Sequence, residues 1–444
     1  MEKLDVQEPH DSAPRPALTG WKANLVVLLL GLLPFVLLEA SLWLIGYKSH
    51  AYYENTAPRI QVFRAAGSQM EVTPERRTQF RTRPFAAVKP QGSLRIVAVG
   101  DSVTAGFARN ANNTGYGFID RSYPEILQSL LASNYPGRAI EVVNCGGSGY
   151  GSYRLKDVTA EVLRYSPDLV TIMLGSSEFL EARHFKNWEG VRAYASRGVL
   201  HWRTLSLARD LLRRALAFRT AGKRRDLILD ANAPSLPWMV QDLVKGADEI
   251  RAVMDHSALN IAGMVRACKA AGVRVILCTS PSNLRMMTSQ SCSPGEDSDF
   301  ARLIRKAQEL VQNRNYAEAI RILAPELEKY QGDYSCGVDI YFLAAEAYDK
   351  TGDMARAYDC YMKAKDLDPA VLRTQSAFND MIRRIAREEG VPLVDIEAAC
   401  RRAVPDGIPD DRLFLDNCHF RPEGHEFVAH VLLEPVRAQL FAER

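Results

Sequence analysis

The feature that most constrains this chain is an apolar run, Leu94–Val99, that leads directly into Gly100-Asp101-Ser102. A buried strand followed by a tight glycine turn and a serine is the arrangement that places a hydroxyl at the carboxyl end of a parallel sheet. A nucleophilic serine needs that exposure and also needs a base. Taken alone, Ser102 can equally be a turn or helix-capping serine.

A suitable base lies more than 300 residues further on, in Leu415-Asp416-Asn417-Cys418-His419. An aspartate and a histidine three residues apart can be presented from one turn. The imidazole of His419 would then take a proton, and the carboxylate of Asp416 would fix its tautomer. Joined to Ser102, this pair makes the catalytic interpretation stronger than the capping one.

Several segments between these two sites alternate between strand and helix patterns. The segment Asp168–Leu174 is a continuous apolar strand, as expected in the middle of a parallel sheet that is buried on both faces. Other predicted strands are Ala139–Val143, Val273–Thr279 and Val391–Ile396. Helical spacing of apolar residues predicts helices at Tyr123–Tyr135, Arg154–Tyr165, Asp248–Ala271, Ser376–Glu389 and Phe420–Glu443.

Four motifs together resemble the SGNH, or GDSL-type, serine hydrolases over roughly residues 93–180 and 255–435. They are Gly100-Asp101-Ser102, the run Asn144-Cys145-Gly146-Gly147-Ser148-Gly149, then Gly175-Ser176-Ser177-Glu178, and finally Asp416 with His419. The resemblance implies a three-layer α/β/α sandwich on a mostly parallel sheet, of the SGNH-hydrolase or flavodoxin-like kind. It also implies ester substrates and no metal or organic cofactor.

The resemblance assigns roles to individual residues. Ser102 would attack the carbonyl, and the N–H groups of Ser102 and Gly149 would hold the oxyanion. Ser177 stands where the family has an asparagine, so a hydroxyl replaces an amide donor. Losing one oxyanion donor typically costs about 10²–10³ in rate. We expect Glu178 to order the loop rather than to act as an acid or base.

The N-terminal part of the chain predicts a membrane anchor. Residues 1–22 are polar, contain several prolines and are expected to be disordered. Residues 23–46 hold one charged side chain, Glu39, and a helix of that length reaches about 36 Å. A buried core helix is the alternative. By analogy with uncleaved signal anchors, we expect a single pass with the following domain outside the cytoplasm, in the periplasm.

Two segments interrupt the alternation of strands and helices. Within residues 180–245, Arg203–Arg219 predicts an amphipathic helix, either a lid or headgroup-facing surface or simply a helix packed on the core. Residues 298–369 resemble a pair of tetratricopeptide repeats, with small residues such as Ala307, Ala319, Ala344 and Ala357 at helical spacing. Because free solenoids need three or more repeats, we expect this pair to pack on the hydrolase domain or on a protein partner.

Charge and cysteine content narrow the function further. A net charge of +3 without long basic runs gives no support for nucleic-acid binding. The eight cysteines contain no Cys-x-x-Cys pair. Cys292 and Cys336 can pair in an oxidising compartment. Cys145 and Cys418 fall in the motifs and should lie near the site, but each has a better-placed neighbour for catalysis.

The sequence therefore predicts a disordered start, an anchor over 23–46, a connector over 47–93, a hydrolase domain over 94–297 and 370–444, and the repeat pair over 298–369. The expected function is hydrolysis, or transfer, of an acyl or acetyl group at a carboxylic ester. The expected substrate is a lipid, a polysaccharide or a small molecule. The alternative is a catalytically weak or inactive assembly protein of the same SGNH fold that binds a partner through its helical repeats. His425 and His430 are expected to be surface or packing residues.

Overall fold

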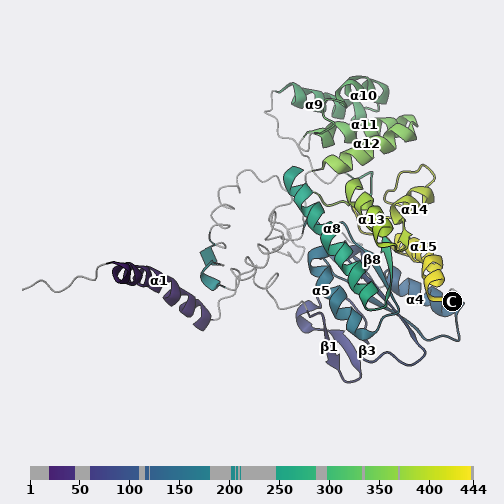
Figure 1. Ribbon diagram of the computed structural model, residues 1–444. Coiled ribbons are helices and arrows are strands. Elements are labelled where there is room, and N and C mark those ends of the chain that lie inside the picture. The colour runs from purple at the N-terminus through teal and green to yellow at the C-terminus, as the bar shows by residue number, and fades with distance from the viewer. Residues whose placement is uncertain are drawn as a thin grey trace, which may run out of the picture. The chain divides into compact units, whose positions relative to one another are not determined.

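The computed structural model describes residues 20–45, 61–109, 116–119, 121–180, 247–286, 298–332, 336–368 and 371–441, with a few positions between 202 and 211 (Figure 1). The chain forms two units, each of which is described by itself. One comprises Met1–Pro58 with Trp188–Arg224, and the other comprises Arg59–Asn187 with Arg225–Arg444.

The larger unit is built on a five-stranded parallel sheet in the order β10-β9-β8-β4-β7. The strands are β4 (Leu94–Gly100), β7 (Ile140–Gly146), β8 (Leu169–Met173), β9 (Arg274–Cys278) and β10 (Leu393–Val394). Strand β4 lies between β7 and β8, with Ala98 opposite both Asn144 and Thr171. The predicted α/β fold with a parallel sheet is confirmed.

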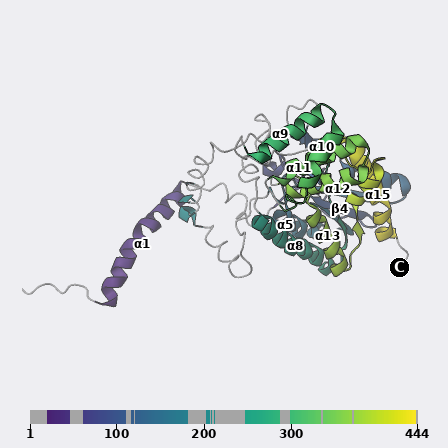
Figure 2. The ribbon, with the colours of Figure 1, turned by 90° about the horizontal axis from the view of Figure 1, so that it is seen from above.

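Helices cover both faces of the sheet, because successive side chains of a strand point to opposite faces. Val97 and Val99 pack in the core with α5 (Ser152–Val162), α8 (Ala247–Ala270) and α13 (Ser376–Glu389). Ile96 packs in the opposite core with α4 (Tyr123–Asn134), α14 (Ile396–Ala403) and α15 (Pro422–Phe441). Figures 1 and 2 show α5 beside α8, and α15 runs along α4.

A small antiparallel sheet forms within the segment that the sequence analysis assigns to a connector. It contains β1 (Phe63–Ala66), β2 (Gln69–Val72) and β3 (Phe85–Ala86), and the 3-10 turn η1 (Pro74–Arg76) follows β2. The N–H groups of Val62 and Phe63 donate to the Glu161 carboxylate at 2.7 and 3.0 Å. Phe63 is fully buried in the core that contains α5, so this small sheet packs as part of the larger unit.

The repeat insertion consists of paired helices. They are α9 (Asp299–Gln312), α10 (Tyr316–Leu323), α11 (Gly337–Thr351) and α12 (Met354–Leu367), with the 3-10 turn η4 (Ala324–Glu326) after α10. Ala307, Ala319, Ala344 and Ala357 are fully buried among these helices. Small side chains let the helix backbones approach closely, as the repeat pattern predicts.

The structure describes one of the two cysteines that the sequence analysis expects to be able to pair. Cys336 is disulfide-bonded, whereas its predicted partner Cys292 lies outside the described residues. The free cysteines are all buried: Cys145, Cys268, Cys278, Cys360, Cys400 and Cys418.

The smaller unit contains α1 (Trp21–Leu44). Within it, Ala23–Leu44 is long and apolar enough to cross a membrane, with a mean hydropathy of 2.5 and 6% of its most apolar window buried. A signal sequence or a core helix can also reach this length and hydropathy. The Glu39 carboxylate accepts hydrogen bonds from the N–H groups of Arg203 and Thr204 at 2.8 and 2.7 Å. The described positions from 203 to 211 are helical, and the rest of the predicted helix Arg203–Arg219 lies outside the described residues.

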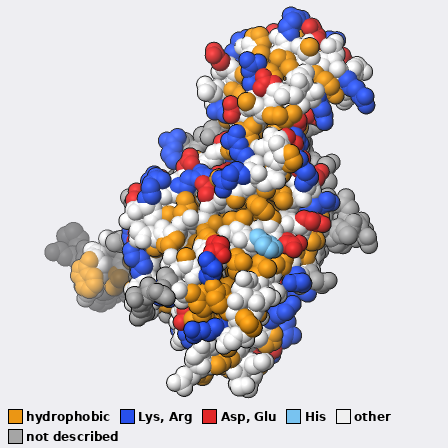
Figure 3. Space-filling view, turned by 90° about the vertical axis from the view of Figure 1, so that its right-hand side faces the viewer, with side chains coloured by type: hydrophobic (Ala, Val, Ile, Leu, Met, Phe, Trp, Pro, Cys, Tyr) orange, Lys and Arg blue, Asp and Glu red, His pale blue; other side chains and the backbone are white. Residues whose placement is uncertain are grey.

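Charged side chains are mixed on the face that Figure 3 shows. Lysine and arginine side chains are scattered there among aspartate and glutamate side chains, and apolar side chains gather over the middle of the face.

Candidate active site

The contacts at the turn after β4 show why the Gly-Asp-Ser motif has a glycine and an aspartate before the serine. A side chain on Gly100 would lie 2.0 Å from Thr104 Oγ1 and 2.2 Å from the Met173 carbonyl oxygen, so only glycine fits. Asp101 caps the short helix α3 (Ser102–Ala105), since its Oδ1 accepts the Val103 N–H at 3.0 Å. Ser102 is therefore the first residue of a helix at the carboxyl end of the sheet.

His419 and Asp416 meet Ser102 at this edge of the sheet. The Nε2 atom of His419 lies 2.8 Å from Ser102 Oγ, and its Nδ1 atom lies 2.8 Å from Asp416 Oδ2. Asp416 Oδ1 accepts the backbone N–H groups of Cys418 and His419 at 2.9 and 2.8 Å. The Leu415 N–H donates to the His419 carbonyl at 2.8 Å and closes this loop. The structure thus brings together the three residues that the sequence pairs across more than 300 positions.

The charges in this loop favour a proton on the imidazole. Burial by itself would lower the pKa of His419, but the adjacent Asp416 carboxylate outweighs it and holds that pKa well above its ordinary value of 6.5. The pKa of Asp416 is lowered in spite of burial, because it faces His419 and accepts two backbone N–H groups. In the neutral imidazole, the hydrogen bond to Asp416 keeps the proton on Nδ1 and leaves Nε2 free to accept the Ser102 proton.

Asp101 has a second function that the sequence analysis missed. Its Oδ2 atom accepts the N–H groups of Gly175 and Ser176 at 3.1 Å each, and the Ser176 hydroxyl at 2.8 Å. The N–H of Ser177 approaches the same oxygen at 3.4 Å. Burial raises the pKa of Asp101. This carboxyl group therefore joins the motif that contains Ser177 to the turn that carries Ser102.

The glycine-rich loop after β7 is held on both sides of Gly149. The N–H of Gly147 donates to the Gly100 carbonyl at 2.9 Å. Gly149 has a φ of 73°, a conformation that favours glycine. The buried guanidinium of Arg154 donates to the Gly149 carbonyl and lies 3.8 Å from the centre of the Tyr150 ring. The sequence predicts the helix that begins near Arg154, but not this contact.

Glu178 has structural contacts. Its fully buried carboxylate accepts the N–H of Ser152 at 2.8 Å, at the first residue of α5, and the Ser257 hydroxyl at 2.6 Å. A carboxylate at a helix N-terminus is stabilised by the unpaired N–H groups there. The contacts agree with the expected role in ordering the loop.

Of the two cysteines in the motifs, Cys418 contacts the site, whereas Cys145 is buried in the core that contains α5. Burial raises the pKa of both Cys145 and Cys418. Cys418 Sγ lies 3.7 Å from His419 Nδ1. Together with Asp416, Cys418 and His419 place one donor atom each within 4.8 Å of one another. Asp416 and His419 already use these atoms in the hydrogen bonds described above.

A three-layer α/β/α sandwich with serine, histidine and aspartate at the carboxyl edge of its sheet defines an acylhydrolase-like fold. The model of the GDSL-like lipase/acylhydrolase family matches residues 98–331, more than half of the chain, and the chain belongs to this family. That match ends before Asp416 and His419. A tetratricopeptide repeat model matches residues 338–371, which contain α11 and α12.

Solved structures with a similar fold include three esterases or hydrolases of low identity. An acetyl xylan esterase is 14% identical, with a TM-score of 0.36 over 77% of this chain and all of its own. An α/β hydrolase from the metagenome of Lake Arreo, Spain, is 17% identical, with a TM-score of 0.32 over 77% and 94%. An acetylxylan esterase from Geobacillus stearothermophilus is 15% identical, with a TM-score of 0.34 over 78% and 95%. A comparison with curated proteins gives no match.

Proposed function

We propose that this protein hydrolyses a carboxylic ester, or transfers its acyl group, with Ser102 as the nucleophile. Ser102 Oγ attacks the carbonyl carbon while His419 Nε2 takes its proton, and Asp416 stabilises the imidazolium. The tetrahedral intermediate then expels the alcohol, which leaves with the proton from His419. Water or an acceptor hydroxyl next attacks the acyl-serine by the same steps in reverse. The observation that carries this proposal is the unbroken hydrogen-bond chain Ser102–His419–Asp416.

The proposed oxyanion donors are the N–H groups of Ser102 and Gly149 together with the Ser177 hydroxyl. The hydrogen bonds of Asp101 support this assignment for Ser177, because they tie its backbone to the turn that carries Ser102. A Ser177→Asn variant restores the amide of the family motif. We expect it to react faster than the wild type, by up to about 10².

The test is labelling of the full-length protein, in detergent, with a fluorophosphonate probe. We expect labelling in the wild type, none in Ser102→Ala, and wild-type labelling in Ser133→Ala, a matched change at an exposed serine of α4. An absence of labelling in both the wild type and Ser177→Asn would contradict the proposal. Adding a sugar acceptor then distinguishes transfer from hydrolysis, since the acyl group appears on the acceptor in one case and as free acid in the other.

The substitution at Ser177 also favours a second candidate, an assembly protein with a degenerate site. In that case the repeat pair over residues 298–369 would bind a protein partner while Ser102 stays inert. The two candidates differ in one outcome. An inert Ser102 gives no labelling in any variant, whereas pull-downs through the repeats would still capture a partner that is lost when the insertion is deleted.

We further propose that residues 23–46 anchor the protein in a membrane with the hydrolase domain on the periplasmic side. The length and apolar composition of α1 support an anchor. An alkaline phosphatase fused after residue 444 tests the side, because this enzyme is active only outside the cytoplasm. Activity of the fusion in intact cells is expected, and an inactive fusion would reverse the orientation. Retention of residues 1–46 in the purified protein would distinguish an anchor from a cleaved signal.

A further inference from the structure

The segments that lead into and out of the repeat insertion both contact the loop that carries Asp416 and His419. Before the insertion, the N–H of Asn283 donates to the Asn417 carbonyl at 3.0 Å, and its side-chain amide donates to the Asp416 carbonyl at 3.2 Å. After the insertion, the Leu372 carbonyl accepts the side-chain amide of Asn417 at 2.7 Å. Asn283 and Leu372, which lie before and after the insertion, therefore both contact the candidate catalytic loop.

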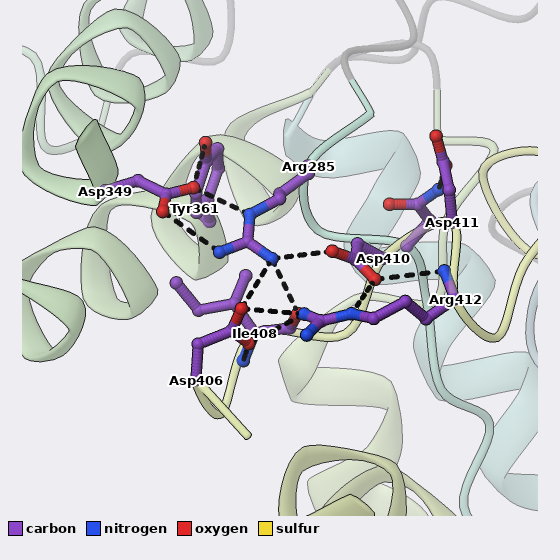
Figure 4. Close-up of polar contacts among 9 residues, drawn as sticks. Arg285, Asp349, Tyr361, Asp406, Ile408, Asp410, Asp411 and Arg412 are labelled. Atoms are coloured by element: carbon purple, nitrogen blue, oxygen red, sulfur yellow. Dashed lines mark hydrogen bonds and ion pairs between the residues drawn. The ribbon is translucent and has the colours of Figure 1, made fainter. Parts of the chain in front are cut away.

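Arg285 extends this connection into the repeats themselves (Figure 4). Its Nε and Nη2 atoms hold both carboxylate oxygens of Asp349, near the end of α11, at 2.6 and 3.0 Å. Its Nη1 atom donates to Asp410 at 2.6 Å and to Asp406 at 3.1 Å. One guanidinium thus joins the second repeat to the segment that precedes Asp416 by a few residues.

The partners of Arg285 are strongly oriented by it. Asp406 and Asp410 also bind Arg412, and the pKa of Asp406 falls to about 2 because these hydrogen bonds outweigh its burial. Facing carboxylates also raise the pKa of Arg285 in spite of its partial burial. Without Arg285, the carboxylate of Asp349 would lose its bidentate partner, and Asp406 and Asp410 would keep Arg412 as their cationic partner. A lysine keeps the charge but cannot hold two carboxylates in a planar fork.

We propose that Arg285 is a positioning residue for the reaction, which fixes the Asp416–His419 loop by tying the segment before it, residues 406–410, to the repeat insertion. The inference rests on the proposed function for its kinetic readout only. It makes the repeat pair a structural part of the hydrolase site rather than an independent module. Leu284, whose N–H donates to the Pro409 carbonyl at 2.9 Å, adds a backbone bond at the same junction.

The test compares full-length variants of the Arg285 junction with a variant of a similar arginine–carboxylate cluster elsewhere in the protein. Arg285→Leu removes the junction, Arg285→Lys keeps only its charge, and Asp349→Asn weakens it from the repeat side. The control is Arg383→Leu. Arg383 is as exposed as Arg285, at 24% against 23%, and it also binds three carboxylates, but these lie in α13 and at the start of α14.

For hydrolysis of a small activated ester, we expect kcat to fall by about 10² in Arg285→Leu with KM little changed, since a displacement near 1 Å has that effect. In Asp349→Asn and Arg285→Lys, kcat should fall by less. Arg383→Leu should keep the wild-type kcat, although it should lose about as much thermal stability as Arg285→Leu. Equal kcat in Arg285→Leu and wild type, or equal losses in Arg285→Leu and Arg383→Leu, would overturn the proposal. If Arg285→Leu does not fold, the kcat values of Asp349→Asn and Arg285→Lys test the proposal in its place, and wild-type kcat in both would overturn it.

Hydrogen exchange separates this inference from the proposed function, because it needs no activity. The N–H groups of Leu415, Cys418 and His419 are hydrogen-bonded within the loop. We expect them to exchange faster in Arg285→Leu and Asp349→Asn, and at the wild-type rate in Arg383→Leu. An inactive wild type with this exchange pattern would contradict the proposed esterase function but would still show that Arg285 fixes the Asp416–His419 loop. Unchanged exchange in all variants would overturn the positioning role.

Discussion

His419 and His425 lie six residues apart in the chain, yet their surroundings give them opposite properties. His419 lies between a carboxylate and a serine hydroxyl, and its pKa is raised well above 6.5. His425 accepts the Tyr123 N–H at 3.2 Å and stacks on the Tyr123 ring. Burial lowers the pKa of His425 to about 3.

The difference shows that a charged partner, and not burial, sets the role of a histidine here. Both imidazoles are removed from water, which disfavours their charged forms. Only His419 has a carboxylate that repays this cost and an available Nε2 atom that faces a hydroxyl. His425 stays neutral and uses Nδ1 as an acceptor for a helix N-terminus. The expectation that His425 is a packing residue agrees with these contacts.

Replacing each histidine by glutamine should give the largest difference in activity between the two positions. We expect His419→Gln to lower kcat for an activated ester by about 10⁶, because the general base is lost. His425→Gln keeps a polar side chain in place and should stay within a few-fold of the wild type. Stopped-flow or steady-state ester hydrolysis measures both. Comparable losses in the two variants would show that His419 has no special role.

The negative charge of Asp416 distinguishes the surroundings of the two histidines, and it can be removed while both imidazole rings are kept. Asp416→Asn should lower kcat by about 10⁴, since the amide no longer favours the required tautomer or stabilises the imidazolium. Asp380→Asn is a suitable control, because Asp380 is an exposed residue of α13 and pairs with Arg383 rather than His419. Circular dichroism and thermal unfolding should show that both variants are folded. A kcat for Asp416→Asn near the wild-type value would contradict the assignment of Asp416.

The pH dependence of activity should follow His419 and not His425. His419 must be deprotonated to accept the Ser102 proton, so kcat/KM rises with pH until the pH passes its raised pKa. The limiting slope on the acid side is about tenfold per pH unit. In Asp416→Asn, the midpoint of the residual activity should move down, because the charge that raises the pKa of His419 is gone. A midpoint below pH 6.5 in the wild type would be inconsistent with the Asp416 contact.

The free energy of unfolding in acid should depend on the protonation of His425. Its pKa of about 3 in the folded state lies below the ordinary 6.5, so the unfolded chain binds a proton that the folded chain does not. Stability is therefore lost as the pH falls from about 6.5 towards 3. His425→Phe should flatten the slope of the free energy of unfolding in this window by about 1.4 kcal/mol per pH unit.

Urea unfolding at several pH values measures this slope. At neutral pH, His425→Phe leaves the Tyr123 N–H unpaired and should cost about 1–3 kcal/mol. An unchanged slope in acid would mean that His425 titrates equally in the folded and unfolded chains. His430→Phe is the exposed control on the same helix, and it should alter neither quantity.

Local patterns explain what could be predicted from the sequence. Strand β8 is five consecutive buried residues, of which all but Thr171 are apolar. Ser102, Asp416 and His419 lie in short motifs whose chemistry can be read directly. The Arg285 contacts could not be read in this way, because Asp349 and Asp410 lie 64 and 125 positions away. Residues 61–93 show the same limit. Their strands are two to four residues long, and their burial depends on distant partners such as Glu161.

Trapping the acyl-enzyme tests the central claim most directly. Full-length protein is mixed with a short-chain activated ester, quenched in acid within the first turnover, digested and analysed by mass spectrometry. The account predicts an acyl group on the peptide that contains Ser102 in the wild type and in His425→Gln, and none in Ser102→Ala or His419→Gln. An acyl group on any other residue, or no acyl group while ester is consumed, would contradict the claim that Ser102 is the nucleophile.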